Sequence, residues 1–223
     1  MNKVYEIYEI LLAHFGPQEW WPGETEFEVM VGAVLTQNTN WGNVSKAIDN
    51  LKKEALLSFE KLHELKVELL AEKIKPAGYF NLKARRLKNL LNFISDEYNG
   101  SLEHMFCEDT VSLREKILTV KGIGPETADS ILLYAGSKPV FVVDTYTHRI
   151  FSRHNVIAEE EGYYEIQEYF TLSLPEEIEL FNEYHALIVR LGKEFCKKSK
   201  PLCSQCPLND FDGFTYPLDM LSL

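Results

Sequence analysis

The segment from Leu118 to Arg153 constrains the fold more than any other part of this 223-residue chain. Two glycines, Gly122 and Gly124, flank a single isoleucine between two stretches of helical periodicity. The second stretch has an apolar face at i, i+3, i+4 and i+7, formed by Ala128, Ile131, Leu132 and Ala135. Glycine permits a positive φ and leaves backbone N–H groups uncovered. The segment therefore predicts two helices joined by a glycine hairpin, which either only makes the turn or also binds a phosphate.

One aspartate follows this hairpin at the start of a further predicted helix. The apolar run from Val140 to Val143 ends in Asp144, and the helical pattern covers residues 145–151. Asp144 is therefore a candidate N-cap, a position where the helix dipole favours an ionised carboxylate. An ionised carboxylate at a fixed distance beyond a phosphate-binding hairpin suits chemistry on a nucleotide.

These two stretches resemble the helix-hairpin-helix DNA glycosylase superfamily, which includes endonuclease III. The sequence KGIGPETADSILLYA is similar to the hairpin of that family, and VFVVDTYTHRIFSR is similar to its catalytic-aspartate segment. The spacing between the two also matches. The resemblance implies an all-α fold of two lobes with the active-site cleft between them. We expect residues 23–121 to form a central lobe that ends at the hairpin, and residues 1–22 plus 122–223 to form the second lobe.

Composition places the chain among soluble globular proteins, because 45% of its residues are hydrophobic and 26% are charged. No apolar run approaches the ~20 residues that a membrane helix needs, and the start of the chain does not resemble a secretory signal. We therefore expect a cytoplasmic monomer without a membrane partner.

The formal net charge of −11 argues against a nucleic-acid partner, because such proteins usually carry a basic footprint. The charges are nevertheless unevenly distributed. One segment holds much of the acid: Glu159, Glu160, Glu161, Glu165, Glu168, Glu176, Glu177 and Glu179. Two other segments hold many of the bases: Lys83, Arg85, Arg86 and Lys88, and Lys193, Lys197, Lys198 and Lys200. A basic face with an acidic back is compatible with double-stranded DNA as the partner, bound with weak non-specific affinity.

The resemblance also implies which residues contact DNA. Gln37, in the stretch LTQNTNW, matches the position that fills the gap left in the duplex by an expelled base; without the resemblance it is equally compatible with a helix cap. A Gly-aromatic turn leads into a predicted helix whose first turns carry Lys83, Arg85 and Arg86. These bases could bind a phosphate, or they could form a solvated basic face. The predicted DNA-contacting set is Gln37, Asn38, Lys83, Lys121, Gly122, Ile123 and Gly124.

The family chemistry is removal of a damaged base from a flipped nucleotide by cleavage of the C1′–N bond. The resemblance implies that Asp144 stabilises positive charge on the sugar or activates the attacking water, as carboxylates do in glycoside hydrolysis. Bifunctional relatives carry a lysine two residues after the second hairpin glycine, and that amine forms a Schiff base. Here the position holds Glu126, which cannot form an imine, so we predict a monofunctional glycosylase. The alternatives are a bifunctional enzyme that uses another lysine, a uracil or thymine mismatch glycosylase, and a non-catalytic helix-hairpin-helix DNA-binding module.

Three tryptophans suggest the class of base. Trp20, Trp21 and Trp41 could offer electron-rich faces to a cationic ring such as 3-methyladenine. The Trp-Trp-Pro loop and Glu126 resemble the 3-methyladenine DNA glycosylase branch of the superfamily. The alternative is that these rings pack in the core. His185, on a predicted apolar helix, is expected to be a packed core histidine rather than a ligand or a base.

Three cysteines near the end of the chain, Cys196, Cys203 and Cys206, have the spacing C-x6-C-x2-C. Many relatives continue with five residues and a fourth cysteine, and together these hold a [4Fe–4S] cluster. Here the fourth position is Asp212. Three interpretations remain open: a cluster completed by Asp212 or by an exogenous ligand, a zinc site with three thiolates and the aspartate, or a decayed site with reduced thiols.

Overall fold

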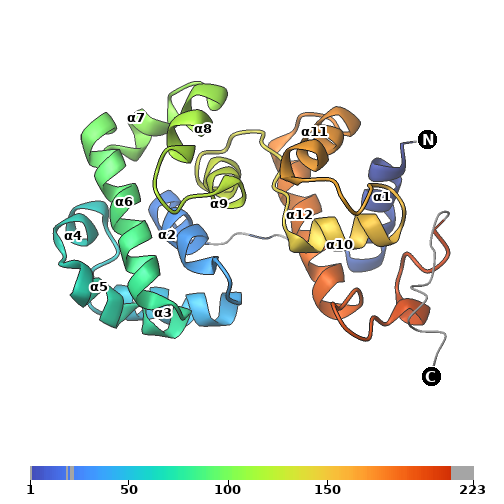
Figure 1. Cartoon of the computed structure of the whole chain (residues 1–223), viewed down its shortest axis with the longest axis horizontal. Helices are drawn as coiled ribbons and strands as arrows, with labels where there is room; N and C mark the ends of the chain where they lie inside the picture. The colour runs from blue at the N-terminus through green and yellow to red at the C-terminus, as the bar shows by residue number, and fades with distance from the viewer. Residues whose placement is uncertain (1, 19, 21–22, 212–223) are drawn as a thin grey trace. The chain divides into compact units, whose positions relative to one another are not determined.

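The computed structural model describes residues 2–18, 20 and 23–211, and every regular element within these ranges is a helix (Figure 1). The expected all-α fold is confirmed. The chain divides into two compact units, residues 21–138 and residues 1–20 plus 139–223. None of the described helices is both long and apolar enough to cross a membrane.

The central unit contains the helices from α2 to α9. Their bounds are α2 Glu26–Thr36, α3 Trp41–Lys53, α4 Phe59–Glu64, α5 Val67–Lys73, α6 Phe80–Tyr98, α7 Leu102–Phe106, α8 Thr110–Leu118 and α9 Pro125–Ser130. A 3-10 turn, Lys75–Ala77, precedes α6, and α9 continues into a π-helical turn, Ile131–Ala135. Eight of the eleven residues of α2 are buried, as expected for a helix that is apolar on nearly all sides. This helix packs against α3, α6, α9 and the π-helical turn, and it is the centre of the unit's core.

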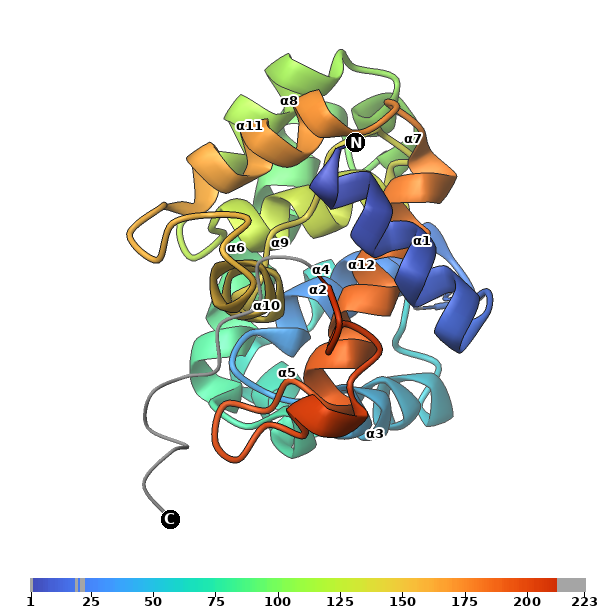
Figure 2. The ribbon, with the colours of Figure 1, turned by 90° about the vertical axis from the view of Figure 1, so that its right-hand side faces the viewer.

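The other unit is built from α1 (Lys3–Phe15), α10 (Thr145–Arg153), α11 (Tyr163–Ser173) and α12 (Ile178–Glu194). The helix α12 packs against both α1 and α10, and the views agree that α1 lies beside it (Figures 1 and 2). Aromatic rings fill the core, with Phe141, Phe151, Phe170, Phe181 and Tyr184 in mutual contact. The segments 1–20 and 139–223 are joined in part through the Tyr184 hydroxyl, which donates to the Val4 carbonyl at 2.6 Å.

The α10–α12 crossing is close because α12 carries a glycine at the contact. A Cβ on Gly192 would lie 2.1 Å from Cδ1 of Tyr146. Arg149 on α10 donates to the carbonyls of Cys196, at 2.9 Å, and of Gly192, at 3.4 Å. These contacts fix α10, and with it Asp144 at its start, against the buried α12.

The predicted lobe boundary after Lys121 needs correction. The chain leaves the central unit at Lys138, so the hairpin and α9 lie inside that unit and not at its end. The reason is packing: α9 contacts α2 and α8, and the π-helical turn contacts α2. Asp144 and the three-cysteine segment do belong to the other unit, together with the start of the chain.

Candidate active site and hairpin

The hairpin between α8 and α9 requires glycine at its first position but not at its second. Gly122 has φ +96°, and a Cβ there would lie 2.5 Å from Cγ of Arg86. Gly124 has φ −99°, is the N-cap of α9, and would place a Cβ in open space. Between them Ile123 is buried at 5% exposure, so only its backbone can face a ligand. Lys121, just before the turn, is exposed and accepts a hydrogen bond from Asn89 at its carbonyl.

The side chain of Gln37 anchors this hairpin. Its Nε2 donates to the Gly122 carbonyl at 3.1 Å and to Thr127 Oγ1 at 2.9 Å. Its Oε1 accepts from Arg86 at 2.6 Å. Three hydrogen bonds therefore hold the amide against the turn, and insertion into a duplex would exchange them for contacts with DNA. The gap-filling role of Gln37 stays a prediction. The structure adds that Gln37 supports the hairpin and that Arg86 holds the Gln37 side chain.

We expect Gly122→Ala to destabilise the hairpin. A β-carbon at φ +96° and 2.5 Å from Arg86 costs about 1–3 kcal/mol, and Tm should fall roughly 2–4 °C for each kcal/mol in a chain of this size. Thermal unfolding of the variant measures this loss. Gly124→Ala is the matched control and should lose less stability, because its φ and the open space accommodate a methyl group and only the N-cap preference for glycine over alanine is lost. Equal Tm values for the wild type and Gly122→Ala would contradict the geometry.

Lys83 does not belong to the DNA-contacting set. Only 1% of it is exposed, and its Nζ donates to the carbonyls of Leu35 at 2.9 Å and Ala77 at 2.6 Å. Burial lowers the pKa of this amine, and the nearby charge of Arg86 lowers it further. Lys83 therefore satisfies carbonyls at the ends of α2 and of the 3-10 turn, and it cannot reach a phosphate. The neighbouring Arg85 is exposed.

Two further predicted positions are accessible. Asn38 follows α2 with an exposed side chain and φ +54°, a left-handed conformation that asparagine tolerates better than most residues. Glu126 is exposed in the first turn of α9, where the helix dipole favours a negative charge. No amine therefore occupies this position of the helix.

Asp144 is the N-cap of α10, as its sequence position predicts. Its Oδ1 accepts from the backbone N–H groups of Tyr146 at 2.9 Å and Thr147 at 2.8 Å, and from the Thr147 hydroxyl at 3.0 Å. The backbone N–H of Asp144 donates to the same hydroxyl at 3.4 Å and completes a capping box. One carboxylate oxygen is thus held by the helix, and the other is oriented by it.

The second oxygen of Asp144 faces His185 of α12. The distance from Oδ2 to Nε2 is 3.6 Å. The side chain of Asp144 is 10% exposed and that of His185 is 9% exposed. The ring of Trp20 stacks on the ring of His185, with the two centroids 6.0 Å apart and the planes 22° apart. The three residues come from separate stretches of the chain within one unit.

The electrostatics favour an ionised Asp144. Burial acts to raise the pKa of the carboxyl, but the interaction with His185 and the hydrogen bonds from Thr147 outweigh it, and the pKa lies below its usual value. A buried carboxylate with one oxygen free of the cap can stabilise a positive charge or orient a water. Sequence reasoning placed His185 in the core, where it is, but missed its contact with Asp144. The only signal was an ionisable residue on an otherwise apolar stretch of α12.

The predicted tryptophan pocket divides between the two units. Trp20 is half-buried beside His185. Trp41 is a half-buried residue of the central unit, and the edge of its ring packs against Gly32 of α2, where a Cβ would lie 3.2 Å from it. Trp21 lies outside the described residues. The role of these rings in binding a base stays a prediction.

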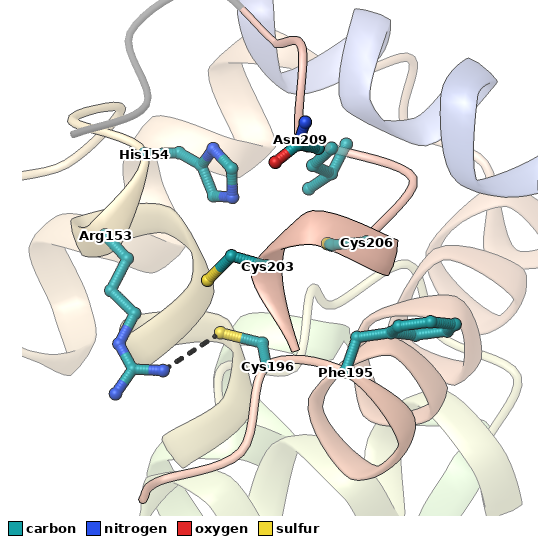
Figure 3. A pocket seen from close by; sticks show the side chains of 8 residues that line it. Arg153, His154, Phe195, Cys196, Cys203, Cys206 and Asn209 are labelled. Carbon is teal, nitrogen blue, oxygen red and sulfur yellow. Dashed lines mark hydrogen bonds between the residues drawn. The ribbon is translucent and has the colours of Figure 1, made fainter. Parts of the chain in front are cut away.

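The three cysteines of the C-terminal segment line one small pocket, which is closed by Arg153, His154, Phe195, Leu208 and Asn209 (Figure 3). Arg153 donates to the Cys196 sulfur at 3.3 Å and to the carbonyls of Lys197 and Lys198. Burial and, to a lesser extent, Cys196 raise the pKa of Cys203, and burial raises that of Cys206 to about 11. Burial of this kind favours the neutral thiol, and a bound cation would favour the thiolate. Asp212 lies outside the described residues.

In the described part of the chain, no three His, Cys, Asp or Glu side chains converge as they would around one metal ion. In a four-iron cluster each thiolate binds a different iron, so the ligands surround the cluster and do not meet at a point. Three thiols in one pocket are donors of the kind that such clusters use, and the cluster, zinc and decayed-site interpretations stay predictions.

Comparison with known proteins agrees with this architecture. The family of HhH-GPD superfamily base excision DNA repair proteins matches residues 31–176. The protein MJ1434 of Methanocaldococcus jannaschii, whose name assigns it provisionally to the DNA repair glycosylases, is 52% identical over 94% of this chain and 96% of its own. Endonuclease III of Sulfolobus acidocaldarius is 31% identical over 83% of this chain and 80% of its own.

Among solved structures, the 3-methyladenine DNA glycosylase MagIII of H. pylori, bound to 1,N6-ethenoadenine, is 33% identical with a TM-score of 0.75. The match covers 87% of this chain and 98% of that one. A non-covalent complex of endonuclease III with DNA gives a TM-score of 0.79 at 23% identity, with 94% of each chain covered, which shows the shared fold. The protein is a DNA glycosylase and belongs to the HhH-GPD superfamily of base excision DNA repair proteins.

Proposed function

We propose that this glycosylase is monofunctional and releases an N-alkylated purine, such as 3-methyladenine, to leave an intact strand with an abasic site. The observation that carries the proposal is the carboxylate of Asp144, which is buried, fixed by its capping box and ionised. Glu126, at the position where bifunctional relatives carry the amine, supports the monofunctional assignment.

The chemistry follows from a carboxylate of this kind. An alkylated purine carries a positive charge, so the electrons of the C1′–N bond move to the ring as it leaves as a neutral base. The positive charge passes to the sugar, where the negative oxygen of Asp144 stabilises it. Water then adds to C1′, and its proton passes to Asp144. The capping box leaves one carboxylate oxygen for this work, and that oxygen lies 3.6 Å from Nε2 of His185.

The choice of an alkylated purine rests on two observations. Trp20 is half-buried and stacks on His185, which in turn faces Asp144. Its aromatic ring is therefore part of the same group of side chains as the carboxylate. The H. pylori relative with 33% identity is named a 3-methyladenine glycosylase, and its structure holds a modified adenine. A cationic base would be attracted to the electron-rich ring, whereas a neutral pyrimidine would gain much less.

The test is a panel of duplexes that contain methylated purines, uracil, thymine mismatches or oxidised pyrimidines, incubated with the wild-type protein. Released bases are quantified by chromatography under single-turnover conditions. We expect release of methylated purines well above the others. Release of uracil, thymine or oxidised pyrimidines without release of methylated purines would overturn the substrate class and leave the glycosylase assignment standing.

We expect Trp20→Leu to lower the release of 3-methyladenine by about thirtyfold. A desolvated cation–π contact contributes ~2 kcal/mol, and ~1.4 kcal/mol corresponds to a tenfold change. Trp20→Phe keeps an aromatic face and should retain most of the activity. Tm is measured alongside, because a ring that only packs would lower stability and reduce release of all substrates alike. That second pattern would exclude Trp20 from the base pocket.

We also propose that Cys196, Cys203 and Cys206 hold a [4Fe–4S] cluster. The shared pocket and the hydrogen bond that Arg153 donates to the Cys196 sulfur support it. Protein purified anaerobically should be brown and should contain about four irons per chain. Colourless protein without iron after anaerobic reconstitution would contradict the cluster.

A further inference from the structure

A histidine completes the wall of the cysteine pocket. His154 directly follows the last residue of α10, is 3% exposed, and lines the same pocket as Cys196, Cys203 and Cys206. Its imidazole ring points into the pocket toward Cys203 (Figure 3). Three cysteines leave one iron of a [4Fe–4S] cluster without a thiolate ligand, because the remaining cysteine, Cys107, is an exposed residue of the central unit. We propose that His154 is the fourth ligand of the iron–sulfur cluster, an inference that rests on the cluster proposed above.

The end of α10 is tied to the cysteine loop independently of any ligand. Arg153 donates to the Cys196 sulfur at 3.3 Å and to the carbonyls of Lys197 at 2.9 Å and Lys198 at 3.1 Å. Because His154 is the next residue, these bonds hold its backbone beside the loop. The ring is therefore held beside the three cysteines, and binding to a cluster would require little additional ordering of the chain.

Asp212 is the alternative fourth ligand. The residue that precedes it in the sequence, Phe211, lies close to His154. The Phe211 ring lies 6.0 Å from the His154 ring at an angle of 74°. Iron and soft sulfur-rich sites accept imidazole readily, whereas carboxylates suit harder cations such as magnesium and calcium. Histidine also replaces cysteine in Rieske centres, where it raises the reduction potential. The chemistry therefore favours the imidazole over the carboxylate at the fourth iron.

The experiment uses the full chain labelled with ¹⁵N at its histidines and reconstituted anaerobically with iron and sulfide. The variants are His154→Ala, His154→Cys and, as matched control, Asp212→Ala. Pulsed EPR of the reduced cluster detects a directly bound histidine nitrogen. Iron retention against a chelator and the reduction potential are measured on the same samples, and circular dichroism confirms that each variant is folded.

We expect nitrogen coupling in the wild type and in Asp212→Ala, and its loss in both His154 variants. His154→Ala should lose iron to the chelator at least about tenfold faster, the loss seen when even an outer partner of a metal site is removed. His154→Cys should keep its iron and shift the potential downward, because a thiolate replaces a neutral ring. A cluster in the wild type without nitrogen coupling, or one that only Asp212→Ala weakens, would overturn the assignment of His154. Failure of every sample to bind iron would instead overturn the cluster itself.

Discussion

Asp144→Asn should lower the single-turnover rate of base release by about 10²- to 10³-fold, the loss typical for removal of one preorganised electrostatic contact to a transition state. Asparagine retains an oxygen that can accept from Tyr146 and Thr147, and it caps helices about as well as aspartate. What it loses is the negative charge on the oxygen that faces His185. The helix should therefore persist while the stabilisation of the sugar cation disappears.

A matched control for this substitution lies in the central unit. Asp109 caps α8 in the same way, through hydrogen bonds from Val111 and Ser112 at 3.1 Å. Asp109→Asn should leave base release unchanged, because this carboxylate serves only its helix. An Asp144→Asn protein that releases methylated bases at the wild-type rate would remove Asp144 from the chemistry.

Stability against pH separates the two roles of Asp144. Its pKa in the folded protein is lowered, so ionisation stabilises the fold above the unfolded pKa of about 3.9, and this contribution is lost as the pH falls through the lower folded value. The unfolding free energies of the wild type and Asp144→Asn should therefore differ at neutral pH. The part of this difference that comes from the charge of Asp144 should disappear in acid, as the pH falls below about 4.

The second large effect is the absence of strand cleavage. Borohydride traps an imine between an enzyme amine and the sugar, and we expect no trapped adduct between this protein and substrate DNA. The physical reason is that Glu126, exposed in the first turn of α9, has no amine to attack C1′. Lys121 precedes the hairpin and lies five residues before Glu126 in the sequence, out of register for the role.

Trapping is measured by denaturing gel electrophoresis after incubation with borohydride, with a bifunctional endonuclease III as positive control. Lys121→Ala is a useful companion variant, because its amine is exposed near the hairpin. An abundant adduct with the wild type, mapped to any lysine, would show that the enzyme is bifunctional. Loss of that adduct in Lys121→Ala would identify the nucleophile.

Local features of the site were predictable from the sequence. The hairpin follows from the glycine spacing, because a positive φ at residue 122 is a local requirement. The capping role of Asp144 follows from a carboxylate between an apolar run and a helix. Both depend on residues within a few positions of one another, where periodicity and turn chemistry are informative.

The features that were missed depend on contacts between distant residues. Lys83 resembles a surface base in the sequence, but the carbonyls of Leu35 and Ala77 bind it in the core. His185 lies beside Asp144, from which it is 41 residues away in the sequence, because the close contact at Gly192 brings α12 against α10. The boundary at Lys138 likewise follows from the packing of α9 on α2, which no local pattern reports.

As proposed above, this glycosylase cuts the base from the sugar and leaves the strand whole. The most direct test is a 5′-labelled duplex with a single 3-methyladenine, incubated with the wild-type protein and analysed on a denaturing gel with and without hot alkali. We predict a full-length strand without alkali and complete cleavage at the modified position after alkali. Cleavage before alkali, or an intact strand in both lanes, would contradict the account.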